Sequence, residues 1–235
     1  MIAIYKRELK SYFLTPIGYI FCGMYLAVSG ITFSYTTLLE QSTESLPTYF
    51  LIMIAVFAVL IPLLTMKLFS EDRKSRTEQV LLTSPVSLTG MVMGKYFAAL
   101  TVFTATFFVN SFNYVLLFQY GSPNVTTIFA NILGLFLIGS AFIAIGIFLS
   151  ALTENQLIAA VTSIGSIAAV LSLKFVIENI GIEWIRVPLK WFSILDRYTP
   201  FTQELLDVTS IVYFISLSAV FVFFTVRVYE KRRWS

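Results

Sequence analysis

Residues 70–85 (SEDRKSRTEQVLLTSP) form the most charged stretch of a chain in which 57% of the residues are hydrophobic. Their charges could bind a soluble partner through ion pairs. Ser70 as a cap, acidic residues in the first turn and Pro85 as a stop predict a short cytoplasmic helix over this stretch. The alternative is a loop that is basic only because positively charged loops stay in the cytoplasm.

The order of residues within this predicted helix favours docking. Asp72 with Arg76, and Lys74 with Glu78, have the i,i+4 spacing of ion pairs that support a helix. The helix then becomes apolar at residues 80–82, and a charged face followed by an apolar tip suits contact with a soluble protein. The candidate docking residues are Glu71, Asp72, Arg73, Arg76, Glu78, Val80, Leu81 and Leu82.

Residues for catalysis or metal binding are scarce. The chain has no histidine and a single cysteine, Cys22, which excludes a disulfide or a Cys/His metal site within one chain. The centres of the long apolar segments lack Asp, Glu, Lys and Arg, so they offer neither a carboxylate pair nor a nucleophile–base pair. We therefore expect no catalytic, cofactor-binding or metal site in this chain, and no nucleic-acid partner.

The segment at residues 90–96 (GMVMGKY), with its two glycines, is superficially like a phosphate-binding loop. Three residues separate its glycines where the motif has four, and Tyr96 follows Lys95 where Ser or Thr is needed. The run also opens an apolar segment. If the protein uses ATP, another chain must bind it.

Three asparagines, Asn110, Asn113 and Asn131, are the main polar groups within the apolar segments. Two roles stay open for them from the sequence. They could hydrogen-bond between helices, or they could line a pathway through the membrane.

The elements that position all of these residues are membrane helices. Only 12% of the residues are charged, against about 25% in a soluble domain, and the mean hydropathy is +0.84. A spanning helix needs roughly 20 apolar residues, and a span must be helical because lipid cannot satisfy an open strand. We predict an all-α membrane protein that forms a single transmembrane domain over residues 1–235. Its six predicted spans are at about residues 17–38, 48–69, 90–118, 125–150, 156–176 and 207–227.

Lysine and arginine predict the orientation of these spans, because loops rich in both stay in the cytoplasm. One side of the membrane keeps Lys174, Arg186, Lys190 and Arg197. The more basic side, with both termini, is therefore predicted to be cytoplasmic. It collects Lys6, Arg7, Lys10, Lys67, Arg73, Lys74, Arg76, Lys95, Arg227, Lys231, Arg232 and Arg233.

Two flanking segments are amphipathic. In residues 1–16 a helix would place Ile2, Tyr5, Leu9, Tyr12 and Phe13 on one face, which predicts a helix lying along the inner membrane surface, with simple anchoring as the alternative role.

The second such segment is residues 177–206, which mix charges with two tryptophans and are broken by Pro188 and Pro200. They predict short interfacial or re-entrant helices that form an external cap or gate, with an ordinary outer loop as the alternative.

Small residues recur four positions apart in the fourth and fifth spans. This spacing lets helices approach closely, so we interpret it as packing and not as a ligand site. The pairs are Gly146 with Ser150, Ser140 with Ala144, and Gly165 with Ala169.

Three segments resemble type-2 ABC transporter permeases, and the similarity covers nearly the whole chain. Residues 6–19 (KRELKSYFLTPIGY) resemble the entry segment of these permeases. Residues 71–87 (EDRKSRTEQVLLTSPVS) resemble their cytoplasmic signature, with Gly94 and Lys95 following. The ending RVYEKRRW at residues 227–234 resembles the branch that includes gliding-motility-associated permeases. The family commonly has Glu, Arg and Gly where this chain has DRKS at residues 72–75, which bears on helix flexibility and partner choice.

The resemblance implies a role for each non-spanning segment. Residues 72–83 would be the coupling helix, seated in a groove of a separate ATP-binding subunit, and residues 2–13 would be the connecting helix beside that subunit. The turn at residues 151–155 would make a second cytoplasmic contact, and residues 177–206 would cover the pathway. The residues of that second contact are Thr153, Glu154 and Asn155.

The resemblance also implies an assembly. Two permease chains, identical or related, would pair in the plasma (inner) membrane of a prokaryote and dock two ATPases, which would bind ATP and Mg²⁺. This chain would not itself be an enzyme. The uncharged spans favour a hydrophobic, amphipathic, lipid-linked or peptide substrate over a small ion, and the resemblance implies export. The alternatives are a complex that transmits force or signal without transport, and an ATP-independent channel, carrier or scaffold.

Overall fold

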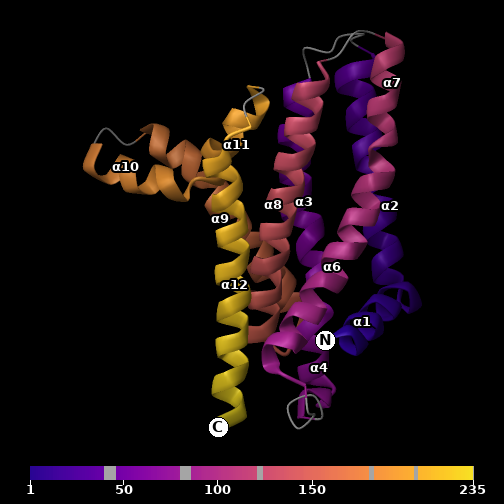
Figure 1. Cartoon of the computed structure of the whole chain (residues 1–235), viewed down its shortest axis with the longest axis vertical. Coiled ribbons are helices and arrows are strands. Elements are labelled where there is room, and N and C mark those ends of the chain that lie inside the picture. Colours follow the sequence, from indigo (N-terminus) through magenta and orange to yellow (C-terminus); the bar gives the residue numbers. More distant parts are fainter. Residues whose placement is uncertain (40–45, 80–85, 121–123, 180–182, 204–205, 235) are drawn as a thin grey trace.

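The computed structural model describes residues 1–39, 46–79, 86–120, 124–179, 183–203 and 206–234, and these form helices without a strand among them (Figure 1). Within these residues six helices are long and apolar enough to cross a membrane, which confirms the predicted all-α membrane fold. Both termini lie at the end of the bundle that carries α4. We refer to this end as the α4 end and to the opposite one as the α10 end. The six candidate spans are Pro16–Thr37, Leu46–Lys74, Leu88–Leu116, Val125–Leu152, Gln156–Asn179 and Val208–Arg233.

Shorter helices flank and extend these spans. The first span is α2 followed by a short π-helix, the second joins α3 to α4, and the third joins α6 to α7. The elements are α1 (Ile2–Leu14), α2 (Pro16–Phe33), η1 (Ser34–Leu38), α3 (Leu46–Thr65), α4 (Lys67–Lys74), α6 (Leu88–Asn110), α7 (Phe112–Tyr120), α8 (Val125–Leu152), α9 (Gln156–Asn179), α10 (Glu183–Phe192), α11 (Ile194–Thr202) and α12 (Val208–Trp234).

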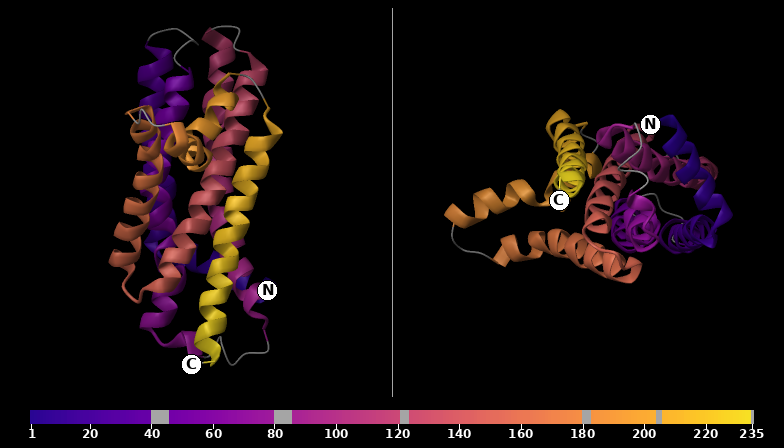
Figure 2. Two further views of the ribbon diagram at one scale, coloured as in Figure 1. Left: turned by 90° about the vertical axis from the view of Figure 1, so that its left-hand side faces the viewer. Right: turned by 90° about the horizontal axis from the view of Figure 1, so that it is seen from below.

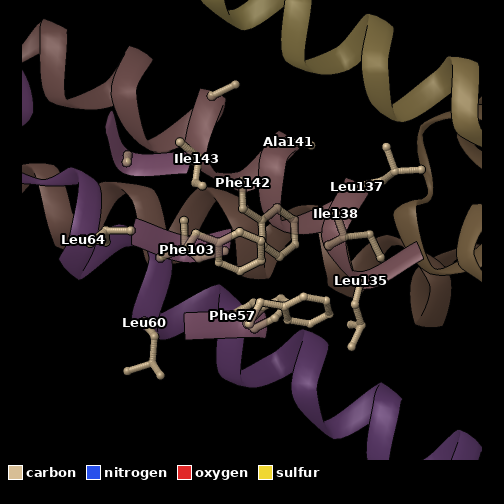
Figure 3. Packing of buried hydrophobic residues seen from close by; sticks show 14 of the residues in the cluster. Phe57, Leu60, Leu64, Phe103, Leu135, Leu137, Ile138, Ala141, Phe142 and Ile143 are labelled. Carbon is tan, nitrogen blue, oxygen red and sulfur yellow. The ribbon is translucent and has the colours of Figure 1, made fainter. Parts of the chain in front are cut away.

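Helix α8 is the centre of the bundle and packs against α3, α6, α9, α11 and α12. Its apolar side chains belong to one buried cluster with aromatic rings from neighbouring helices, and Figure 3 shows Phe142 of α8, Phe57 of α3 and Phe103 of α6 among them. The ring centroids of Phe57 and Phe103 are 5.2 Å apart in an edge-on arrangement that aromatic pairs favour. Because helices gain no hydrophobic advantage from leaving lipid, such close packing is what holds the bundle together.

Glycines of α8 make this packing possible. A Cβ atom at Gly146 would lie 2.2 Å from Thr65 Oγ1, and one at Gly139 would lie 2.2 Å from Phe103 Cζ. Four residues after Gly146, Ser150 Oγ donates to the Met66 carbonyl at 2.8 Å. The pair Gly146 and Ser150 therefore packs as predicted. At Gly165 of α9 a Cβ would meet no atom within 4 Å, so the packing predicted there does not occur within this chain.

Helix α1 lies across the α4 end, against α6 and α2 (Figure 1). The predicted helix is present, and the residues of its predicted apolar face differ in burial within this chain. Ile2 is 69% exposed and Phe13 50% exposed, whereas Glu8 and Tyr12 are buried. An acidic residue can take this place because a buried cation of α6 faces it, as described below. Burial raises the pKa of Tyr12 well above its ordinary value, so its hydroxyl stays protonated and donates to the Leu64 carbonyl at 2.9 Å.

The segment predicted to hold short external helices contains α10 and α11. Pro188 and Pro200 lie inside these helices and do not end them, which corrects the predicted break points. The change of direction falls at Ser193, whose hydroxyl accepts from the Asp196 amide at 3.3 Å and caps α11. Figure 2 shows α10 and the adjoining end of α9 reaching away from the other helices, while α11 returns to α8.

Candidate functional site

The helix that carries the charged residues begins before Ser70, because it is the last part of the second span. Helix α4 continues α3, because Met66 between them keeps helical angles (φ −54°, ψ −35°). Ser70 is therefore buried inside a helix and is not its cap, a correction that follows from burial of Leu68 and Phe69 in the bundle. The helix ends at a turn in which Arg76 has φ 59°, a left-handed conformation that breaks a helix. The predicted apolar tip, Val80, Leu81 and Leu82, lies outside the described residues.

This turn changes the ion pairs of the segment. Asp72 bonds not with Arg76 but with Lys95 of α6, at 2.6 Å between Oδ2 and Nζ, and its Oδ1 accepts from Thr77 at 2.9 Å. Glu78 pairs not with Lys74 but with Arg232 of α12, at 3.2 Å. The predicted i,i+4 pairs were wrong because they require a helix that runs past residue 76.

Lys95 is the centre of the junction between α1, α4 and α6. Its side chain is only 1% exposed, and its Nζ lies 3.1 Å from Glu8 Oε1 and 2.6 Å from Asp72 Oδ2. The Leu68 carbonyl accepts a further hydrogen bond, and the Phe69 ring centroid is 4.8 Å away. A buried ammonium needs such partners, since an unpaired charge away from water is costly.

Arg7 completes the junction from the surface. Its Nη2 atom lies 3.3 Å from Asp72 Oδ2 and also bonds with Glu8. Burial disfavours the charged form of Arg7, but the bonds with Glu8 and Asp72 outweigh it and raise the pKa of the guanidinium. Arg7, Glu8, Asp72 and Lys95 therefore form one ion network, which we call the junction network.

Glu8 and Lys95 were not predicted from the sequence as members of a site. Two features could have indicated them. Glu8 is an acid on the buried face of α1, and Lys95 is a lone cation in a long apolar segment, so each needs the other. Gly94 lets the helices meet, because a Cβ there would lie 3.2 Å from the Met1 carbonyl oxygen and 3.4 Å from Ile4.

The two predicted cytoplasmic contacts lie together. Arg73 of α4 pairs with Glu154 at 2.9 Å and donates to the Leu152 carbonyl at 3.1 Å. Thr153 and Asn155 contribute to the local turn, where Asn155 Oδ1 accepts from the Leu157 amide at 2.9 Å and caps α9. A polar hollow of about 520 Å³ opens beside these residues. It is lined by Arg73, Lys74, Arg76, Glu78, Gln79, Glu154 and Arg232.

Comparison with known protein families decides the class of this protein. The family described as "ABC-2 family transporter protein" matches residues 24–230, which cover most of the first candidate span, the next four in full and nearly all of the sixth. They also include every residue that lines the polar hollow except Arg232. The chain belongs to the ABC-2 transporter family. No curated protein matches it. The chain is thus a multi-pass membrane subunit of an ABC transporter, and subunits of this kind are generally not catalytic.

Within this ABC-2 permease, Asn110 lies in a buried polar cluster between α2, α3 and α6. Its Nδ2 donates to the hydroxyls of Tyr25 at 3.2 Å and Tyr49 at 3.1 Å, and Ser29 and Asn113 donate to its Oδ1. Asn110 is 1% exposed. Its bonds thus connect three helices.

Asn131 of the ABC-2 permease has a similar position at the α10 end. It is fully buried, and its Oδ1 accepts from the Tyr198 hydroxyl of α11 at 2.7 Å. Burial raises the pKa of Tyr198 far above its ordinary value, so the hydroxyl remains a donor. This bond fixes α11 on α8. A pathway-lining role for Asn110, Asn113 and Asn131 stays a prediction that would require a second chain.

Replacing Arg73 with glutamate is expected to open the polar hollow with little loss of stability. The Arg73 and Glu154 side chains are 30% and 61% exposed, so their pair should contribute no more than about 1 kcal/mol. The reversed pair Arg73→Glu/Glu154→Arg should restore the contact, which a double-mutant cycle on thermal midpoints would measure. A large loss in Arg73→Glu that the reversed pair does not recover would contradict this account.

Proposed function

We propose that this permease is driven by a separate ATP-binding subunit, which docks at the α4 end beside the polar hollow. The observation that carries the proposal is the continuity of α4 with the second span. A subunit that moved residues 71–74 of α4 would move α3 directly, because Met66 leaves the helix unbroken. The basic composition of this end supports its placement in the cytoplasm, where ATP is found.

The junction network would carry that movement to two more helices. Asp72 of α4 bonds with Lys95 of α6, and Lys95 bonds with Glu8 of α1. Binding of ATP would drive the change only by stabilising one conformation of the whole complex more than another. In this proposal the partner binds ATP and Mg²⁺. This chain supplies the helices whose movement opens the pathway to one side of the membrane or to the other.

Six spans would make half of a transporter. We infer that a second permease chain, identical or related, pairs with this one and that two ATPases dock below in the inner membrane of a prokaryote. The substrate that fits best is hydrophobic, amphipathic, lipid-linked or a peptide, because the buried faces of the spans are largely apolar. Export is the direction that the type-2 resemblance favours.

The experiment that tests the partner is co-purification. The tagged chain is extracted from its native membrane in mild detergent, and the mass and stoichiometry of its companions are measured. We expect one ATP-binding subunit per permease chain. A homo-oligomer that carries no ATPase, under conditions that preserve a known ABC complex, would overturn the proposed drive.

The docking residues have their own test. Replacing Leu81 or Leu82 with aspartate is expected to abolish ATPase stimulation by the permease while the spans stay folded, because both residues follow the charged segment outside the spans. ATPase activity of the reconstituted complex and the thermal midpoint of the permease are the two readouts. Val86→Asp, just beyond the predicted helix, is the matched control. Full activity in both leucine variants would remove this segment from the docking surface.

A further inference from the structure

The four basic residues at the α10 end gather around one place. Lys174 comes from α9, Arg186 and Lys190 come from α10, and Arg197 comes from α11. Two adjoining hollows separate these helices, with volumes of about 260 Å³ and 200 Å³. They share Lys190 and Asp196. The first is also lined by Lys174, Ile177, Glu178 and Arg186, and the second by Val187, Trp191 and Arg197. We call the two together the outer hollow.

The charges of the outer hollow are not paired. Among the described residues, none of its four cations forms an ion pair within 4.0 Å, although Glu178 and Asp196 line the same space. At the α4 end, several basic residues have carboxylate partners, among them Arg7, Lys95, Arg73 and Arg232. Neighbouring like charges repel one another, so an anion in the hollow would be held favourably.

Arg197 also has a buried atom that lacks a hydrogen-bond partner. Its guanidinium lies between the rings of Trp191 and Tyr213, at 5.5 Å and 5.6 Å from their centroids. Its Nε atom is buried and has no hydrogen-bond partner. A buried donor without a partner is uncommon and costs free energy, which a bound acceptor would recover. The stacking keeps the guanidinium in place for that acceptor.

Exposed aromatic residues place the hollow beside a membrane surface. Trp184 is 91% exposed and Trp191 and Phe192 are each 65% exposed on α10, the helix that carries Arg186 and Lys190. Tryptophan is enriched where lipid headgroups begin, and an amphipathic helix with basic residues lies in that layer. Most of the residues that line the two hollows are charged. The space therefore suits a polar headgroup and not acyl chains.

We propose that the outer hollow binds the phosphate of an anionic lipid from the outer leaflet, while the acyl chains stay in the bilayer beside α10. Arg186, Lys190 and Arg197 donate to the phosphate oxygens. Glu178 and Asp196 accept from hydroxyl groups of a headgroup such as glycerol, and they keep the net positive charge of the hollow small. This site depends on the position of α10 at the membrane surface and not on an ATPase partner.

Tryptophan quenching in vesicles tests the proposal on the full chain. The chain has three tryptophans, so the background Trp184→Phe/Trp234→Phe leaves Trp191 as the reporter beside Arg197. The probes are phosphatidylglycerol and phosphatidylcholine with brominated acyl chains, added to vesicles of unlabelled phosphatidylcholine. We expect half-quenching at about a tenfold lower mole fraction of phosphatidylglycerol than of phosphatidylcholine, given the strength of basic residues near a membrane surface.

Charge variants separate this site from general attraction to the membrane. Arg186→Gln/Lys190→Gln should remove the preference for phosphatidylglycerol, whereas the matched change Lys231→Gln/Arg233→Gln at the α4 end should keep it. If the first double variant does not elute as a folded protein, the exposed single change Arg186→Gln takes its place. Equal quenching by both lipids, or a preference that survives the loss of Arg186 and Lys190, would overturn the proposal.

Soluble anions distinguish the source of the phosphate. In vesicles, glycerol 3-phosphate and inorganic phosphate at millimolar concentration should not relieve quenching by phosphatidylglycerol, because the acyl chains hold the lipid at the site. Relief by either anion, together with loss of that relief in Arg186→Gln/Lys190→Gln, would assign the outer hollow to a free phosphate compound and overturn the lipid proposal.

Discussion

Replacing Lys95 with methionine is expected to destabilise the permease by about 3 kcal/mol, near the lower end of the range for breaking a buried ion pair. The change leaves Glu8 and Asp72 as neighbouring carboxylates whose side chains are 8% and 15% exposed. Arg7 still contacts both, which moderates the loss. The thermal midpoint in detergent should fall by roughly 6–12 °C, from the usual relation for chains of this length.

Arg227→Met is the control for this change. Arg227 and Glu230 lie 2.6 Å apart, the same distance as Lys95 and Asp72, but their side chains are 62% and 38% exposed. Exposed pairs contribute at most about 1 kcal/mol, so this variant should keep its midpoint within a few degrees. Equal midpoints for the two methionine variants would show that burial does not decide the strength of these pairs and would contradict the description of the junction.

A variant that removes the charges of Glu8, Asp72 and Lys95 distinguishes the effect of their ion pairs from the effect of side-chain packing. Glu8→Gln/Asp72→Asn/Lys95→Met should regain most of the lost stability, because no buried charge is left without a partner. If this variant folds and still binds an ATPase but is no longer driven by it, the ion network transmits movement and does not only hold the helices together. If driving survives, the helix contacts alone carry the movement.

The spans could be predicted from the sequence because lipid imposes a simple rule. Any helix between polar ends must be about 20 residues long and apolar, and all six candidate spans satisfy it. The segment at residues 70–85 was less predictable, since charge made it look separate from the bundle. Burial of Leu68 and Phe69 against the rest of the chain is a tertiary effect, and it extends the helix to Lys74.

The partners of the site residues could not be predicted from the local sequence pattern, for the same reason. Asp72 could be assigned to Arg76 by spacing, but Lys95 is 23 residues away and Glu8 is 87 residues from Lys95. Only the crossing of α1 over α6 at Gly94 brings them together. Helix periodicity gives the faces of single helices, whereas the choice between a lipid-facing and a buried side needs the packed bundle.

The contact of α8 with α3 should be almost as sensitive as the junction network. In Gly146→Ala the new Cβ would lie 2.2 Å from Thr65 Oγ1 and 3.0 Å from Thr65 Cβ, so one helix must move. Thr65 is fully buried and cannot turn away freely. Overpacking of this kind typically costs about 1–3 kcal/mol, and the thermal midpoint should fall accordingly.

Gly23→Ala and the double variant Thr65→Ala/Gly146→Ala are the variants with which the thermal midpoint of Gly146→Ala is compared. A Cβ at Gly23 of α2 would meet nothing within 4 Å, and alanine is the better helix former, so that midpoint should stay or rise. Thr65→Ala/Gly146→Ala removes Oγ1 and should regain part of the loss. Equal midpoints for both single variants would mean that α3 and α8 are not as close as described.

The effect of Gly146→Ala should reach the proposed docking surface as well. Ser150, one turn after Gly146, bonds with the Met66 carbonyl at 2.8 Å and with the Phe69 and Ser70 amides, each at 3.2 Å. These bonds fix α8 at the point where α3 becomes α4. A displaced α8 would loosen them and shift Arg73 relative to Glu154, so stimulation of the ATPase should fall together with stability in Gly146→Ala and recover together in the double variant. Recovery of stability without recovery of stimulation would show that the position of α4 depends on the Thr65 hydroxyl itself, and not on the spacing of the two helices.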